Sequence, residues 1–228
     1  MIRFANFLVF IVFALCTSPL MHAQSCSYEM AMEKQGLLEI TKSVPGVNVQ
    51  LKYATQYNFM KRDVYGCLQH GYLQKEVVAM LKKAQKSLES MKPGYHLLVY
   101  DAARPLSIQW ILWNTLTQYP PKIRKNYVAD PREHSIHNYG SAIDLTVADE
   151  KGNALDMGTK FDFFGELAYP SKEQELLAKN KLSKKAYENR QILRNAMESA
   201  GFMPIEYEWW HFNAFSRAEA KRRYQVVQ

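Results

Sequence analysis

The sequence is poor in cysteine, with three in 228 residues, at positions 16, 26 and 67. So few cysteines do not make a disulfide framework for a chain of this length. Internal repeats, low-complexity tracts and an obvious linker are also absent, so nothing in the sequence divides it into several domains. The lysines are scattered and no nucleic-acid-binding motif is present, so we expect no nucleic-acid partner despite the formal charge of +7.

The composition is that of one globular domain. Hydrophobic residues make up 47% of the chain and charged residues 22%. A chain of this size can bury one sizeable core without a second domain.

The first 23 residues are expected to form a signal peptide. A positive start, MIR, precedes an apolar run, FANFLVFIVFALC, and a polar region that ends in Ala23. The apolar run is shorter than the roughly 20 residues of a membrane-spanning helix, so an uncleaved anchor is the weaker alternative. We therefore expect export, with a mature chain of residues 24–228 and a periplasmic location.

Removal of this leader would take Cys16 away and leave Cys26 and Cys67. In an oxidising compartment these two can form a disulfide, but two unpaired thiols fit the sequence nearly as well. Lipid modification of Cys26 is a minor alternative, because AQSC lacks the usual leucine before the cysteine.

Hydrophobic periodicity predicts a mixture of helices and strands. Apolar positions recur at helical spacing over residues 75–91 and 184–200, and Pro105 is placed to open a further helix over 106–118. Strands are expected at 48–54, 95–101, 141–147 and 206–213. Because these elements do not alternate regularly, we predict a single α+β domain with a mainly antiparallel sheet flanked by helices.

The segment EHSIHNYGSAIDLTV, residues 133–147, places polar side chains beside a buried strand. Alternation along the strand puts Asp144 on the face opposite Ile143 and Leu145. Gly140 allows a sharp turn just before the strand, which can bring the ring of His137 back toward Asp144. Histidine and carboxylate side chains are both zinc ligands.

A catalytic zinc site needs about three protein ligands and an open position, so a third ligand should come from elsewhere. His211 in EWWHF is the best candidate, although His134 could replace one of the three. Glu208 lies three residues before His211, and a carboxylate beside a metal is suited to take a proton from water. On a flat strand the two side chains would point to opposite faces, so a bulge or the strand's end must redirect one of them. The H-E-x-x-H motif is absent.

Together these segments resemble a known superfamily. SIHNYGSAIDL is similar to the S-x-H-x-x-G-x-A-x-D segment, and EWWH to the E-x-W-H segment, of the zinc D-Ala-D-Ala metallopeptidases, which also include the Hedgehog signalling domain. YATQYNFM at 53–60, DAARP at 101–105 and DMGTKFD at 156–162 resemble more specifically the D-alanyl-D-alanine dipeptidases, of which the vancomycin-resistance dipeptidase is the best-known type. The matches span roughly residues 45–215 and imply a Hedgehog/DD-peptidase-like fold.

The resemblance implies one zinc ion per chain, bound by His137, Asp144 and His211. Cobalt or iron would also suit two histidines and one carboxylate. Glu208 would act as general base and then protonate the leaving amine. Arg104 would stabilise the oxyanion of the tetrahedral intermediate, unless it serves as a structural salt bridge to Asp101.

A dipeptidase must also recognise both charged ends of its substrate. Asp156 is the candidate for the substrate's ammonium, with a turn cap beside Gly158 as its alternative role. Ser135 is the candidate for the carboxylate, with a local backbone cap as its alternative. His134 becomes a residue that orients a ligand, and one of Trp209 and Trp210 would wall the pocket.

The expected function is hydrolysis of the D-Ala-D-Ala dipeptide by a zinc metallopeptidase that is not an integral membrane protein once processed. Export distinguishes this chain from the resistance enzymes and favours turnover of envelope-derived peptides. A D,D- or L,D-carboxypeptidase that trims peptidoglycan stems is the enzyme alternative. A zinc-containing binding module without activity is an alternative of another class, against which Glu208 and Arg104 argue. The sequence does not fix the oligomeric state.

Overall fold

The computed structural model describes Met1 and residues 26–228. Apart from Met1, the predicted signal peptide lies outside the described residues. The longest helices are α3 and α7, and the longest strands are β4 and β5. In chain order the elements are α1 (Ser27–Lys34), β1 (Leu38–Glu39), α2 (Ile40–Ser43), β2 (Asn48–Val49), η1 (Lys52–Ala54), β3 (Tyr72–Leu73), α3 (Lys75–Met91), β4 (His96–Asp101), α4 (Leu106–Thr115), α5 (Pro121–Arg124), η2 (Ile136–Tyr139), β5 (Ala142–Ala148), η3 (Glu166–Ala168), η4 (Pro170–Lys172), α6 (Glu173–Ala178), α7 (Lys184–Ser199), β6 (Met203–Pro204), β7 (His211–Asn213) and α8 (Arg217–Arg223), where η marks 3₁₀ turns.

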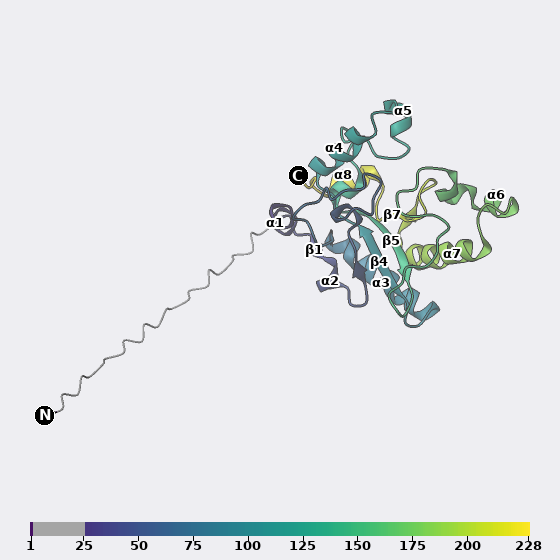
Figure 1. The fold of residues 1–228 in the computed structure, drawn as a ribbon, viewed down its shortest axis with the longest axis horizontal. Coiled ribbons are helices and arrows are strands. Elements are labelled where there is room, and N and C mark those ends of the chain that lie inside the picture. The colour runs from purple at the N-terminus through teal and green to yellow at the C-terminus, as the bar shows by residue number, and fades with distance from the viewer. Residues whose placement is uncertain (2–25) are drawn as a thin grey trace.

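The main sheet has five strands in the order β2-β4-β5-β7-β6. Only the β2–β4 pair is parallel, and the other three pairs are antiparallel. Strands β1 and β3 form a separate two-stranded sheet. Figure 1 shows helices α4, α5 and α8 gathered on one side of the molecule and α6 and α7 on another. The predicted α+β fold with a mainly antiparallel sheet is confirmed.

Helices α3 and α7 pack against each other and against β4 and β5. Their predicted ranges are confirmed to within one residue, and Val77, Leu81, Ala84 and Leu88 of α3 are completely buried, whereas Met91 at the end of the stripe is exposed. On β5, Ile143 and Leu145 join the same core, as the alternation predicts. Burial of a leucine-sized side chain contributes about 2 kcal/mol to the free energy of folding, so these contacts hold β5 in a fixed position.

Three predicted elements are shorter than expected. The strand at 48–54 ends at Val49 and turns into η1, because the Tyr53 carbonyl accepts hydrogen bonds from Val64 and Tyr65 instead of pairing in the sheet. The helix predicted to reach residue 118 ends at Thr115. The strand predicted at 206–213 begins only at His211, after a bend at 206–207 and a turn at 209–210.

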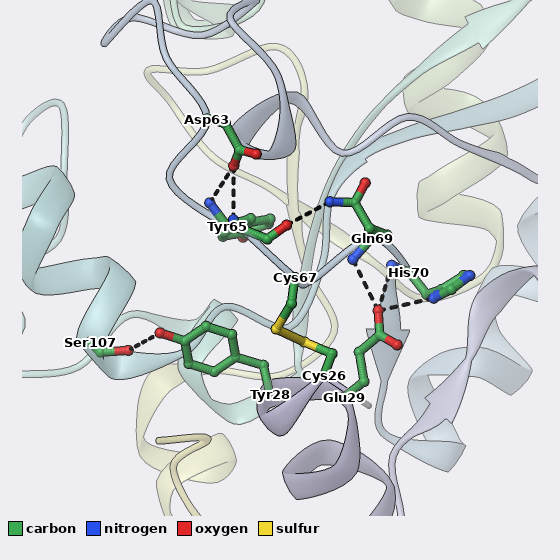
Figure 2. The surroundings of a disulfide bond; sticks show 10 residues. Cys26, Tyr28, Glu29, Asp63, Tyr65, Cys67, Gln69, His70 and Ser107 are labelled. Atoms are coloured by element: carbon green, nitrogen blue, oxygen red, sulfur yellow. Dashed lines mark hydrogen bonds and ion pairs between the residues drawn. A yellow bond between two sulfur atoms is a disulfide. The ribbon is translucent and has the colours of Figure 1, made fainter. Parts of the chain in front are cut away.

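The N-terminal helix is held by a disulfide between Cys26 and Cys67, whose Cα atoms lie 5.3 Å apart (Figure 2). The Glu29 carboxylate adds hydrogen bonds from the backbone N–H groups of Gln69 and His70. Around this link a second apolar cluster packs α1 and α4 on the loop after η1. Of the two readings that the sequence left open for these cysteines, the structure has the disulfide.

No helix among the described residues is both long enough and apolar enough to cross a membrane.

Candidate active site

Three predicted metal ligands converge at one point, from η2, β5 and β7. His137, Asp144 and His211 each offer a ligand atom, and these atoms lie within 4.8 Å of one another. His211 Nδ1 is 2.9 Å from Asp144 Oδ1 and 3.2 Å from His137 Nε2, and His137 Nε2 is 3.3 Å from Asp144 Oδ1. Asp144 and His211 lie directly opposite each other in the antiparallel β5–β7 pair.

The turn before β5 brings His137 into this group. Ser135 caps η2 by accepting a hydrogen bond from the His137 N–H, and Asn138 accepts one in return from the Ser135 N–H. Gly140 then adopts a left-handed conformation, φ +61°, which ends the turn. A Cβ atom at this position would lie 2.8 Å from Leu37, so both the conformation and the close approach favour glycine.

Hydrogen bonds outside the group fix how both imidazoles face it. His137 Nδ1 lies 2.7 Å from the Ala102 carbonyl, so this nitrogen carries the proton and donates it. His211 Nε2 lies 2.8 Å from Asn213 Oδ1 and donates to that oxygen. The lone pairs of His137 Nε2 and His211 Nδ1 therefore face Asp144, an arrangement that orients histidines as metal ligands.

The donor set fits a divalent transition metal. Burial alone would raise the pKa of Asp144, but positive charge on His137 and His211, which protons supply there when no metal does, holds it well below its ordinary value. Asp144 is thus an anion, and two imidazole lone pairs point at the same small space. Such a group is stable only with a cation among its members, and a metal ion with mixed nitrogen and oxygen preference suits it.

Glu208 lies beside the group, in the turn that precedes β7. The Trp209 N–H donates to the Ala168 carbonyl, so the chain reaches β7 from a turn and not along a strand. This turn places Glu208 Oε2 3.9 Å from His211 Nδ1. The two side chains therefore lie on the same side, which a flat strand would not allow. Desolvation raises the pKa of Glu208 to about 8, although His211 opposes the shift. The carboxyl is therefore set near the range in which a general base works best.

Arg104 lies on the loop after β4 and is buried. Its Nε and Nη2 atoms lie 2.8 and 2.5 Å from Asp101 Oδ2, and Nη1 donates to Gln109 Oε1 over 2.9 Å. Asp101 also accepts a hydrogen bond from the hydroxyl of Tyr65. Nη2 is 3.7 Å from Asp144 Oδ2. The salt bridge between Arg104 and Asp101 is therefore present. It holds the guanidinium beside the metal-binding group, and one N–H on each of Nη1 and Nη2 stays free to donate.

The metal-binding group, Glu208 and Arg104 line one cavity of about 190 Å³. The profile of the D-ala-D-ala dipeptidase family, Peptidase M15, matches residues 33–228. The chain belongs to this family. It is therefore a metallopeptidase, and His137, Asp144 and His211 are the group that can hold its metal.

Individual family members are similar over most of their length. The D-alanyl-D-alanine dipeptidase of Escherichia coli (strain K12) is 34% identical over 77% of this chain and 83% of its own. The D-alanyl-D-alanine dipeptidases of Enterococcus faecalis and Enterococcus faecium are 33% and 34% identical, each over 78% of this chain and 91% and 90% of their own. Among solved structures, the LdcB LD-carboxypeptidase covers 78% of this chain and 70% of its own at 18% identity, with a TM-score of 0.43.

Asp156 does not reach the cavity of this family member. It is exposed, and its carboxylate accepts a hydrogen bond from the Gly158 N–H over 2.8 Å, which is the turn-cap role. The second acid of the same motif, Asp162, lines the cavity instead and accepts hydrogen bonds from the Tyr53 hydroxyl (3.1 Å) and the Phe59 N–H (3.3 Å). Burial raises the pKa of Asp162 to about 7. DMGTKFD contains both acids, and only the tertiary structure separates the turn cap from the cavity residue.

Ser135 is buried and lines the cavity, so its capping bond to His137 and a position beside a ligand are both present. His134 is not in the metal-binding group. Its Nδ1 pairs with the Tyr139 hydroxyl at 3.0 Å, so this nitrogen does not orient a carboxylate. Trp210 lines the cavity, whereas the ring nitrogen of Trp209 donates to the Thr159 hydroxyl. One tryptophan therefore walls the pocket, as predicted.

Proposed function

We propose that this protein hydrolyses the D-alanyl-D-alanine dipeptide to D-alanine. The observation that carries the proposal is the convergence of His137, Asp144 and His211, with Glu208 beside them, in a small cavity of a chain that belongs to the D-ala-D-ala dipeptidase family. The similar proteins named as D-alanyl-D-alanine dipeptidases support the substrate.

The metal that we propose is one zinc ion per chain, held by His137 Nε2, Asp144 and His211 Nδ1. Zinc accepts two imidazole nitrogens and one carboxylate and keeps a further position open in catalytic sites. When bound there it would polarise the scissile carbonyl and lower the pKa of water.

Glu208 is proposed as the general base. Its carboxylate takes a proton from the attacking water while the water oxygen bonds to the carbonyl carbon. The same proton then passes to the leaving amine as the carbon–nitrogen bond breaks, so Glu208 ends each turnover ionised.

Arg104 is proposed to donate to the oxyanion of the tetrahedral intermediate. Its position is fixed in advance by Asp101 and Gln109, so little reorganisation is needed when charge develops. Removal of one such donor typically costs about 3 kcal/mol of transition-state stabilisation.

The two charged ends of the dipeptide need separate partners. Asp162, with the Tyr53 hydroxyl beside it, is proposed for the ammonium, in place of Asp156. Burial disfavours the ionised form of Asp162, and the positive charge of a bound ammonium would stabilise that form. Ser135 remains the proposed contact for the carboxylate end.

We further propose that the protein acts outside the cytoplasm, in the periplasm, after cleavage of residues 1–23, on dipeptides derived from the cell wall. The Cys26–Cys67 disulfide supports export, because such bonds persist in oxidising compartments. It also argues against the lipid anchor, since the Cys26 sulfur is already bonded.

The test is hydrolysis by the zinc-loaded protein of D-Ala-D-Ala, L-Ala-L-Ala and a pentapeptide that ends in D-Ala-D-Ala. We expect D-alanine from the free D,D-dipeptide, little from the pentapeptide and no hydrolysis of the L,L-dipeptide. Cleavage of the pentapeptide alone would make the protein a carboxypeptidase. No cleavage of any of the three peptides despite bound zinc would favour the alternative of a zinc-containing binding module without activity.

A further inference from the structure

Three cationic side chains line the catalytic cavity, and two of them are neutralised by acids. Arg104 is paired with Asp101, and Lys125 lies 2.5 Å from Glu133. Arg217 has no carboxylate within ion-pair distance among residues 26–228. The structure thus leaves one cavity-lining cation whose charge is available to a ligand.

The guanidinium of Arg217 is held in place by a neutral group. Its Nη1 donates to the His134 carbonyl over 2.7 Å. His134 adopts a left-handed conformation, φ +61°, which is uncommon for a residue other than glycine, and its ring is held by the Tyr139 hydroxyl. This bond uses one of the five guanidinium N–H groups of Arg217 and leaves the others for an acceptor.

Arg217 is bonded to the segment that carries Ser135, the residue proposed for the carboxylate end of the substrate. Its anchor, His134, directly precedes Ser135, which also lines the cavity. The acid that we assign to the ammonium, Asp162, is bonded to Tyr53 and Phe59, a different set of residues. The cavity therefore combines an anion on one set of contacts with an unpaired cation on another.

We propose that Arg217 binds the C-terminal carboxylate of the substrate, beside Ser135, and that the enzyme consequently prefers a peptide with a free C-terminus to one whose C-terminus is neutral. The proposal rests on the proposed dipeptidase function and adds its specificity determinant. A planar guanidinium is suited to a carboxylate, which it can bind through two parallel hydrogen bonds.

This role predicts an effect on binding and not on the chemical step. The carboxylate carries the same charge in the ground state and in the transition state, so its loss of a partner should raise KM and leave kcat nearly unchanged. Since Arg217 is exposed and lines the cavity, salt should also weaken the contact.

The experiment compares Arg217→Met and Arg217→Lys with the unmodified protein on D-Ala-D-Ala and on D-alanyl-D-alaninamide, whose C-terminus is neutral. Arg222→Met is the matched control, because Arg222 is an exposed arginine on the same helix, outside the cavity. We expect Arg217→Met to raise KM for the acid about tenfold or more and to leave hydrolysis of the amide unchanged. Arg217→Lys should recover part of the loss, and Arg222→Met should behave as the unmodified protein.

Equal losses on the acid and the amide would mean that Arg217 is only structural, and no loss on the acid would also overturn the proposal. A second measurement needs no turnover: calorimetric titration of the zinc-loaded proteins with D-alanine. Binding that weakens about tenfold in Arg217→Met would sustain the carboxylate site even if D-Ala-D-Ala were not hydrolysed. Hydrolysis of D-Ala-D-Ala with no effect of the substitution would leave the proposed function standing and remove this inference.

Discussion

The Cys26–Cys67 disulfide closes a loop with a sequence separation of 41 and is expected to contribute strongly to stability. By the chain-entropy relation, a cross-link over a loop of this length stabilises the folded state by about 4 kcal/mol. The bond fastens α1 to the loop that contains Tyr65, whose hydroxyl donates to the aspartate that holds Arg104. Loss of the bond should therefore lower the free energy of unfolding, and it should affect the position of Arg104 only indirectly, through the loop that contains Tyr65.

The assay is urea unfolding followed by tryptophan fluorescence, on the oxidised protein, the reduced protein and Cys26→Ala/Cys67→Ala. Reduction removes the cross-link and keeps both sulfur atoms, so it separates chain entropy from packing. With an m value of about 2 kcal/mol/M, we expect the midpoint to fall by about 2 M in the reduced protein and by at least as much in the double variant. A midpoint that moves by less than about 0.3 M would refute this reasoning.

Two further predictions concern the cavity. Asn213→Leu removes the acceptor that orients His211, so zinc affinity should fall about 10- to 100-fold, whereas Asn213→Asp should retain it; competition with a chelator measures both, and equal affinities in all three proteins would exclude the role of Asn213. Folding raises the pKa of Asp162 from its ordinary 3.8 to about 7, mainly by burial and further by Asp144. Its ionisation therefore costs stability, a cost that is absent below pH 3.8 and complete above about pH 7. The urea midpoint of metal-free Asp162→Asn should then exceed that of the unmodified protein by more at pH 8 than at pH 5, and a difference that is constant with pH would contradict this assignment.

Local patterns predicted the parts of the fold that local forces determine. The helical repeat of apolar residues located α3 and α7, because each must bury one stripe. The alternation along β5 placed Asp144 away from the helix-packed core, and Gly140 marked the turn that returns His137 to it. The register that sets Asp144 opposite His211 depends on how two distant strands pair, and no local pattern contains it.

The features that the sequence did not yield depend on tertiary contacts. Val49 and Tyr53 alternate like strand residues, yet Tyr53 turns toward the loop that carries Tyr65. Asp156 fits a turn with Gly158 and takes that role, while Asp162 reaches the cavity only because Phe59 and Tyr53 approach it.

Arg217 carries no local signal either. In the sequence it is one of several basic residues near the C-terminus, and its distinction in the structure is that none of the acids of residues 26–228 pairs with it at the cavity. Paired and unpaired cations become distinguishable only when their neighbours are known.

The most direct measurement is the rate of D-alanine release from D-Ala-D-Ala by the zinc-loaded protein and by Glu208→Gln at equal zinc content. We predict turnover by the unmodified protein and a rate reduced by a factor of about 1,000 or more in Glu208→Gln, with one zinc ion still bound to each. Absence of D-alanine release by the unmodified protein, or full activity of Glu208→Gln, would contradict the proposed mechanism.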